Sequence, residues 1–386
     1  MNRPCRGSRR CAAIVFAAAL ALIGVAPAVH ADEYAIGILA PLTGPWAPLG
    51  TALRNGITLA LERSEDAGTF REGVKLSLKA LDDVGPPTAI ADRAAKFVRD
   101  EDAILLVGPA FSAQAEAVAL AANRDRFPML SPAVSPGVTL AGVWSFRTGA
   151  SPYQMIDAFS SYLMKVQRPK KIAIAYAAGN AGFKSLAEAF SRSVSRQGGL
   201  IVADLGVGES ENFFSSAAAS ISTVDPDLVM LFLDAEPAAA LAVQLRKAGL
   251  QERTRLAFAP AAAQPALIRI GGDAVENALL ATDYLPELPG GQNRAFVAAF
   301  RQRFGGTPDR WAGIGYTTGL IAAEAIRHAG PGPNRQTVRL ALERVSSLAV
   351  PLGGLTWQQD MHRNPHYAPA LFTIRAGAFV PLEAQP

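Results

Sequence analysis

The chain has 386 residues, of which 50% are hydrophobic and 18% are charged. This composition is ordinary for a globular protein and is too apolar for an intrinsically disordered one. At roughly 100–200 residues per domain, the length predicts two domains.

Residues 1–31 have the layout of a secretory signal peptide. A basic segment with four arginines precedes the apolar run 12–26, and small or apolar residues follow it, so cleavage is expected before Asp32. The alternative is a retained membrane anchor, but the apolar run is short for a full span of the bilayer.

Removal of this segment changes the charge and the cysteine content of the protein. The 37 Lys and Arg residues lose four arginines, which leaves 33 basic residues against 33 acidic ones. Cys5 and Cys11, the two cysteines of the chain, are lost as well. A neutral product gives no reason to expect a nucleic-acid partner, and a product without disulfides depends on its core for stability. No later stretch reaches 18 uninterrupted apolar residues, so we expect a soluble product outside the cytoplasmic membrane.

Short apolar runs alternate with helical patterns along the rest of the chain. The first run, 34–40, precedes a loop rich in Pro and Gly, 41–50, which holds up Trp46. The other expected strands are 74–81, 103–107, 127–130, 144–148, 171–176, 200–206, 227–233, 255–259 and 278–284. The expected helices are 49–61, 86–99, 115–122, 152–166, 181–196, 213–223, 236–249, 292–304, 310–328 and 334–346. This alternation predicts an α/β fold with parallel sheets and helices on both faces, in which ligands bind at the carboxyl ends of the strands.

The C-terminal region is less regular. Strands are expected at 355–357, 371–374 and 379–382, with a hairpin turn at Gly377 between the last two.

The turn from Gly108 to Gln114 links an expected strand to an expected helix. Gly108 and Pro109 turn the chain, and Ser112 stands where the N-cap of the helix is expected. A helix N-terminus with free N–H groups and a nearby hydroxyl suits a carboxylate or a phosphate. The alternative is an ordinary capped turn that binds nothing. A second loop with serine, 131–136, follows the next strand and favours a binding role.

The sequence lacks the motifs of several common catalytic and cofactor-binding sites. The chain has no G-x-G-x-x-G that opens a helix, no P-loop and no G-x-S-x-G elbow. The histidines beyond residue 31, His328, His362 and His366, have no nearby residues to complete a metal site. Neither Ser112 nor Ser135 has an identifiable base, which argues against an exported hydrolase. We expect no cofactor, no metal and no catalysis, and we expect residues 82–83 to form a solvated loop.

A set of short motifs, spread in order over the whole chain beyond residue 31, is similar to a known family. The motifs are residues 35–45, Val107-Gly108-Pro109, Ser131-Pro132, Phe146-Arg147-Thr148 with Gln154, and Gly315-Tyr316. Together they resemble the branched-chain amino acid-type (Leu/Ile/Val-binding-like) periplasmic binding proteins of ABC transporters.

The resemblance implies a type I periplasmic binding protein, with two Rossmann-like lobes joined by a three-crossing hinge. The first lobe is expected to be 32–149 plus 285–352, and the second to be 150–284 plus 353–386. The crossings would fall near Gly149, Tyr284 and Gly353. Such a protein encloses a small ligand between its lobes, delivers it to a membrane ABC permease and catalyses nothing; we expect a monomer.

The resemblance also implies contacts with the ligand in the first lobe. The family's carboxylate-binding turn corresponds to Ser112 and the backbone of Ala110, with Phe111 between them. Its second carboxylate contact corresponds to Ser135 and the backbone of Val134. Trp46 and Trp311 are the expected aromatic contacts, although both are also plausible core residues. Arg147, near a crossing, is either a ligand contact or a structural salt-bridge partner.

The second lobe departs from the family pattern. Amino acid-binding members carry an acid where this chain has Ala261, and a tyrosine where it has Ala181, before the glycine of the Asn180-Ala181-Gly182 loop. Asp234 or Glu236 could take the place of the acid, or they could simply cap the helix that begins there. Phe183 suits the apolar or aromatic body of a ligand.

These departures leave two kinds of ligand open. A buried ammonium without a carboxylate partner is costly. The ligand is therefore either a hydrophobic or branched-chain amino acid, or an aromatic or aliphatic acid that lacks an amine. The alternative function is a sensing module of the same fold that reports its ligand to a signalling partner.

Overall fold

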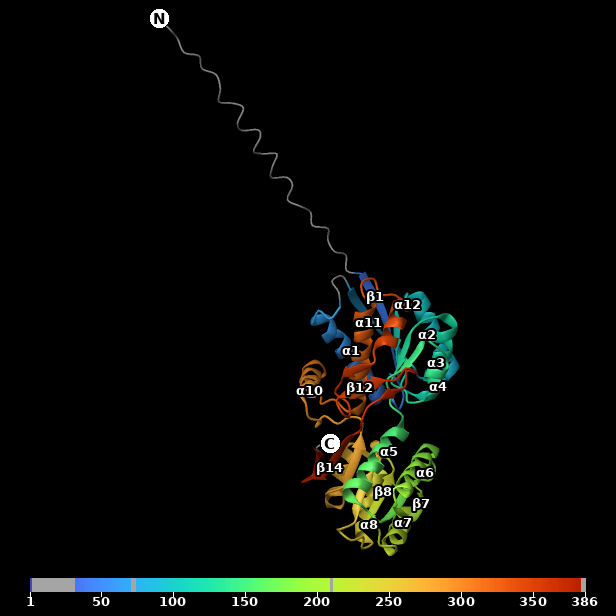
Figure 1. Cartoon of the computed structure of the whole chain (residues 1–386), viewed down its shortest axis with the longest axis vertical. Helices are drawn as coiled ribbons and strands as arrows, with labels where there is room; N and C mark the ends of the chain where they lie inside the picture. Colours follow the sequence, from blue (N-terminus) through green and yellow to red (C-terminus); the bar gives the residue numbers. More distant parts are fainter. Residues whose placement is uncertain (2–31, 71–73, 209–210, 383–386) are drawn as a thin grey trace.

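The computed structural model describes residues 1, 32–70, 74–208 and 211–382 (Figure 1). The expected signal peptide, apart from Met1, lies outside the described residues. The described chain forms two α/β bodies, one above the other in Figure 1.

The first body contains a parallel sheet with the strand order β2-β1-β3-β4-β5. Its strands are β1 (Asp32–Ala40), β2 (Val74–Asp82), β3 (Leu105–Val107), β4 (Met129–Ser131) and β5 (Ser145–Arg147). Alternate side chains of β1 are buried on opposite faces, because Ile36 and Ile38 belong to one core cluster and Ala35 and Leu39 to another. Burial on both faces is the reason that β1 is an almost unbroken apolar run.

Helices cover both faces of this sheet. The cluster around Ala35 and Leu39 is completed by α2 (Pro87–Asp100) and α3 (Ser112–Asp125). The cluster around Ile36 and Ile38 is completed by α1 (Ala47–Asp66) and α11 (Arg310–Ala329). The short α4 (Gly137–Leu140), α10 (Gly291–Phe304) and α12 (Arg335–Arg344) complete this part of the chain.

The second body contains a seven-stranded sheet with the order β15-β14-β10-β9-β8-β6-β7. Its strands are β6 (Lys171–Ala177), β7 (Leu200–Val207), β8 (Leu228–Phe232), β9 (Arg255–Phe258), β10 (Leu279–Thr282), β14 (Ala370–Arg375) and β15 (Ala378–Pro381). The strands from β6 to β10 are parallel, whereas β14 and β15 form an antiparallel hairpin at the edge. The hairpin predicted at Gly377 is confirmed, and Gly377 has a φ of 71° there.

Four helices flank the second sheet. One face carries α5 (Pro152–Tyr162), which continues as a π-helical turn (Leu163–Gln167), and α6 (Ala181–Arg196). The other face carries α7 (Glu211–Thr223) and α8 (Ala235–Lys247). Two short helical turns (Pro260–Ala262 and Gly272–Val275) and α9 (Pro265–Gly271) lie between β9 and β10.

The chain passes between the two sheets at three places. It leaves the first sheet after β5, returns to the first body after β10, and enters the second sheet again at β14. Before the last passage, β11 (Ser347–Ala349), β12 (Thr356–Gln359) and β13 (Pro365–His366) form a small antiparallel sheet. The sequence pattern did not predict β11, β13, α4 or α9, because each is too short to show a period.

Three glycines bring α1 and α11 unusually close together. A Cβ added to Gly56 would lie 2.2 Å from the carbonyl oxygen of Ala312, and one added to Gly315 would lie 2.2 Å from that of Leu53. A Cβ on Gly319 would meet the Cβ of Ala60 at 2.6 Å. The helices therefore pack backbone against backbone, which fixes where the first turn of α11 lies over the sheet.

We predict that Gly315→Ala destabilises the protein by about 1–3 kcal/mol, the range for an overpacked core, because the new methyl group meets a main-chain oxygen that only a helix shift can move. Unfolding in urea measures this change in free energy. The control is Gly306→Ala, where a Cβ would have no atom within 4 Å. Equal stability of the two variants would contradict the packing argument.

Candidate ligand-binding site

A cavity of about 270 Å³ opens at the carboxyl ends of the first sheet, beside the three passages of the chain. The strand-to-helix loops of β3, β4 and β5, the first turns of α11 and the segments that cross between the sheets all contribute to its wall. The lining residues are Ala110, Phe111, Ser112, Pro132, Val134, Thr148, Gly149, Pro152, Asp283, Arg310, Trp311, Ile314, Leu352 and Tyr367. The edge at which it lies is where α/β folds bind their ligands.

The turn between β3 and α3 supplies Ala110, Phe111 and Ser112 to the cavity. The prediction that Ser112 is the N-cap is wrong: Phe111 is the N-cap, and no side chain caps the helix. Ser112 is the first residue of α3, so its backbone N–H is one of the groups that a helix leaves without an internal partner. Among the described residues, the Ser112 hydroxyl has no recorded hydrogen bond either. Both groups are available to an anion at the cavity wall.

Two residues of the loop after β4, Val134 and Ser135, have different roles. Val134 lines the cavity, and its carbonyl oxygen accepts a hydrogen bond from Nη1 of Arg147 at 3.1 Å. Ser135 is not among the lining residues. Its hydroxyl donates to the carboxylate of Glu116 on α3 and accepts from the backbone N–H of Gly137 at 3.2 Å. In this structure Ser135 therefore secures the loop that carries Val134.

Trp46 and Trp311 occupy different surroundings. Trp46 is 58% exposed, which excludes a plain core role, and its ring meets the ring of Phe111 edge to face at 5.6 Å between centroids. Trp311 lines the cavity and is partly buried against the core. The loop that holds Trp46 is fastened to the end of β2, because Asp82 accepts hydrogen bonds from the backbone of Leu42 at 2.9 Å and the hydroxyl of Thr43 at 2.5 Å.

The four expected residues of the second lobe are not part of the cavity wall in this structure. Phe183 lies in the first turn of α6, next to a helix N-cap formed by Asn180. Asp234 is the N-cap residue of α8, and Glu236 pairs with Arg269 at 3.6 Å on the surface. Ala261 lies in the helical turn after β9. All four follow carboxyl ends of strands in the second sheet, as the family pattern implies.

The cavity contains an ion pair that sequence reasoning missed. Arg310, the first residue of α11, donates from Nε and Nη2 to the two carboxylate oxygens of Asp283, with 2.7 Å between Nη2 and Oδ2. Burial acts to lower the pKa of Arg310, but the charge and hydrogen bonds of Asp283 outweigh it and raise that pKa. The guanidinium also lies 5.2 Å from the ring centroid of Trp311.

Thr148 and Tyr367, which were not predicted either, add polar groups. The hydroxyl of Thr148 lies 2.8 Å from that of Thr318, and its carbonyl oxygen accepts from the indole N–H of Trp357 at 3.0 Å. The Tyr367 hydroxyl accepts from the backbone N–H of Ala150 at 3.3 Å. The expected crossings at 149, 284 and 353 were a signal for Thr148 and Asp283, which directly precede two of them. Arg310 and Tyr367 lie farther along the chain from any crossing, and no sequence signal pointed to them.

Arg147 is structural in this arrangement. It is buried, and it donates to the carbonyl oxygens of Val134 and Gly149 and to the side-chain oxygen of Asn364. Burial lowers the pKa of its guanidinium. The residue therefore ties the loop after β4 to the segment before β14 rather than presenting its charge to the cavity.

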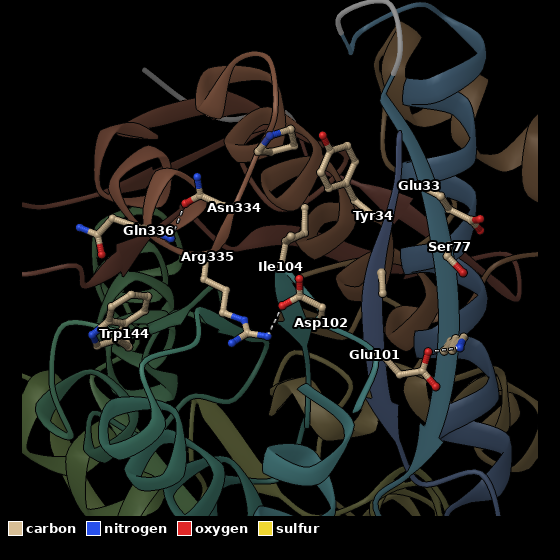
Figure 2. A pocket seen from close by; sticks show the side chains of 13 residues that line it. Glu33, Tyr34, Ser77, Glu101, Asp102, Ile104, Trp144, Asn334, Arg335 and Gln336 are labelled. Carbon is tan, nitrogen blue, oxygen red and sulfur yellow. Dashed lines mark hydrogen bonds and ion pairs between the residues drawn. The ribbon is translucent and has the colours of Figure 1, made fainter. Parts of the chain in front are cut away.

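A larger hollow of about 830 Å³ lies at the opposite edge of the first sheet (Figure 2). It lies beside the amino ends of β1 and β3 and the start of α12. Four of its charged residues form two ion pairs, because Arg335 binds Asp102 at 2.6 Å and Lys79 binds Glu101. This edge is the wrong end of a parallel sheet for a ligand site, and the smaller cavity is the better candidate.

The described residues contain no group of three or more His, Cys, Asp or Glu side chains that could hold a metal ion. Of the helices that the structure describes, none has the length and apolar character needed to span a membrane.

Comparison with known proteins agrees with the fold. Residues 33–377 match the family model of the periplasmic binding proteins, and the chain belongs to that family. It is similar to a Leu/Ile/Val-binding protein homolog 3 of Brucella melitensis, with 30% identity over 233 residues. That alignment covers 60% of this chain and 62% of the relative, so it spans less than two thirds of the relative's length.

Solved structures share the fold. An ABC transporter solute-binding protein from R. palustris, solved with benzoate, has a TM-score of 0.71 and 24% identity, and covers 91% of this chain and 96% of its own. An ABC transporter substrate-binding protein from Desulfitobacterium hafniense, solved with Leu, has a TM-score of 0.73 and 22% identity, and covers 91% of this chain and 100% of its own. At these identities the likeness establishes the type I fold with two lobes, and not the ligand.

Asp83, which directly follows β2, contradicts the expectation of a solvated loop. Its side chain is buried, with 1% of the residue exposed, and neither carboxylate oxygen has a hydrogen-bond partner among the described residues. Burial, and then the charge of Asp82, raise the pKa of Asp83 to about 7, although Arg93 acts in the opposite direction. A buried carboxyl of this kind makes stability depend on pH.

The direction of this pH dependence follows from the pKa of Asp83 in the unfolded and in the folded protein. The carboxyl ionises near 3.8 when unfolded and near 7 when folded. The unfolded state therefore releases its proton first, and stability falls as the pH rises from about 4 to about 7. Asp83→Asn cannot ionise, so we predict that its stability relative to wild type increases between pH 5 and pH 8 by up to a few kcal/mol.

Urea unfolding at pH 5, 6.5 and 8 measures this difference, with the exposed Asp66→Asn as the control. A stability difference between Asp83→Asn and wild type that does not change with pH would rule out the titration of Asp83.

Proposed function

We propose that this protein is a periplasmic solute receptor, which binds a small carboxylate between its two lobes and delivers it to a membrane ABC permease. The observation that carries the proposal is the start of α3 in the cavity wall, with the Ser112 hydroxyl and backbone N–H beside the aromatic ring of Phe111. A volume of about 270 Å³ is just below the usual range of ligand pockets and suits one small molecule.

The anionic end of the ligand is assigned to the turn at Ser112. A helix N-terminus offers N–H groups and the positive end of the helix dipole, and both favour a carboxylate over a neutral group. The apolar body is assigned to Phe111, Val134 and Trp311, with Trp46 at the entrance. Phe183 and Ala261 are the proposed contacts from the second lobe once the lobes close.

The charges favour a ligand without an amine. Asp283 is the one acidic residue among those that line the cavity, and both of its oxygens already bind Arg310. Glu236, a candidate partner for an ammonium, pairs with Arg269. An aromatic or aliphatic acid is therefore the first candidate, in line with the benzoate bound to the R. palustris protein. A branched-chain amino acid, with Asp234 as its partner, is the second.

The two lobes are proposed to be 32–149 plus 285–352 and 150–284 plus 353–386. The hinge would then comprise the three segments that also carry Thr148, Asp283 and Leu352 to the cavity wall. Export by a signal peptide that is cut before Asp32 fits a periplasmic receptor. The same fold without a permease would serve as a sensing module; a specific complex with a permease, detected by pull-down from membranes, favours the transport role.

We predict that Ser112→Ala weakens binding of the carboxylate by about 1–3 kcal/mol, the range for a hydrogen bond to a charged group. Ser135→Ala is expected to weaken binding as well, through the loop that carries Val134. Isothermal titration gives the affinities, and Ser220→Ala on α7 is the control, because its exposed hydroxyl donates to the Ser216 carbonyl oxygen within the helix. Wild-type affinity in Ser112→Ala would remove this turn from the site.

A thermal-shift panel tests the class of ligand. Benzoate, 4-hydroxybenzoate, leucine and isoleucine at concentrations far above their Kd should raise the melting temperature only if they bind the folded state. Because the acidic groups near the cavity are already paired, we predict that the aromatic acids raise the melting temperature. A rise with leucine and isoleucine alone would contradict it and restore the amino-acid ligand, while the absence of any rise would contradict the carboxylate receptor itself.

A further inference from the structure

The Arg310–Asp283 pair joins the two bodies of the protein. Asp283 directly follows β10 of the second sheet, whereas Arg310 begins α11, which packs on the first. The backbone N–H of Gly353, on another crossing segment, donates to the carbonyl oxygen of Asp283 at 2.8 Å. Asp283 thus lies where two of the three crossings meet, and Arg310 contacts it from the cavity side.

The two side chains differ in their exposure. Asp283 is 4% exposed, and Arg310 is 28% exposed. The carboxylate of Asp283 accepts hydrogen bonds from Nε and Nη2 of Arg310. Arginine has five N–H donors, and two of them are on Nη1. Among the described residues, Nη1 of Arg310 has no recorded acceptor, although the side chain lines the cavity.

The pair is therefore asymmetric, because Asp283 is buried whereas Arg310, on the cavity side, is partly exposed. Asp283 fixes the plane of the guanidinium, and the neighbouring ring of Trp311 limits its movement, with 5.2 Å between the guanidinium carbon and the ring centroid. A guanidinium held in this way presents its remaining N–H groups in a defined direction, which suits bidentate or shared recognition of an oxyanion.

We infer that Arg310 is a ligand-binding, specificity-determining residue, which donates from Nη1 to the anionic group of the ligand while Asp283 orients it from the hinge. This inference rests on the proposed function, since it concerns the same cavity. It adds a positive side chain to the hydroxyl and N–H of Ser112. It also links the charge of the ligand to the hinge, because the residue that contacts the anion is bound to the end of β10.

A purely structural pair makes a different prediction from a ligand-binding one. If the pair only holds the hinge, Arg310→Gln and Asp283→Asn break the same interaction and should change affinity in the same direction. If Arg310 binds the anion, Arg310→Gln removes a donor, whereas Asp283→Asn removes a competing negative charge and keeps one acceptor for the guanidinium. The two substitutions should then change affinity in opposite directions.

The experiment is isothermal titration of the full chain with benzoate, or with leucine if benzoate does not bind the wild type. We expect Arg310→Gln to weaken binding at least tenfold and Asp283→Asn to tighten it severalfold. The control pair is Arg303→Gln and Glu62→Gln, which breaks a surface ion pair of 3.3 Å and should leave the affinity unchanged. Equal weakening by Arg310→Gln and Asp283→Asn, or wild-type affinity in Arg310→Gln, would overturn the inference.

Other outcomes are decisive as well. If Arg310→Gln does not fold, Asp283→Asn decides alone: tighter binding supports the inference and weaker binding overturns it. A wild-type protein that binds none of the carboxylates overturns the proposed function and this inference with it. If the wild type binds benzoate and the Arg310→Gln variant binds it equally well, only the inference is overturned.

Discussion

The candidate site depends on where α11 begins. The first turns of this helix bring Arg310, Trp311 and Ile314 to the cavity wall. Close contact between the backbones of α1 and α11, which only glycine permits at Gly56 and Gly315, sets the position of the helix over the first sheet. The ion pair with Asp283 then fixes its first residue to the end of β10. A shift of α11 by the width of a methyl group would therefore move one wall of the cavity and weaken the ion pair that links α11 to the second sheet.

The remaining wall follows from parallel strands that end at one edge. The loops after β3, β4 and β5 begin side by side because these strands are neighbours in the sheet. Hydrogen bonds hold two of the loops at this edge: Ser135 and Arg147 secure the loop after β4, and Asp82 secures the loop after β1, which carries Trp46. Rigid loops around a helix N-terminus form a preorganised site. Because these loops are already ordered, the entropic cost of binding a ligand is smaller.

The sequence predicted the α/β class, most strands and helices to within a few residues, and the turn at Ala110–Ser112, because alternating apolar runs and helical periods are local signals. It misplaced the start of α3, since helix ends are decided by single hydrogen bonds. It placed Asp83 in solvent, because burial of a charged side chain depends on tertiary packing. Arg310 and Tyr367 could not be found by pattern, because they come from segments that are distant in the sequence and that only the fold brings to the cavity.

The central claim is that the cavity beside Ser112 binds the carboxylate of a small acid. A crystal structure of the protein with benzoate, or with the acid that binds most tightly, tests it most directly. We predict that the carboxylate lies within hydrogen-bond distance of the hydroxyl or backbone N–H of Ser112, with the apolar body against Phe111 and Trp311. A ligand whose carboxylate faces the second lobe, or one bound in the hollow beside α12, would contradict it.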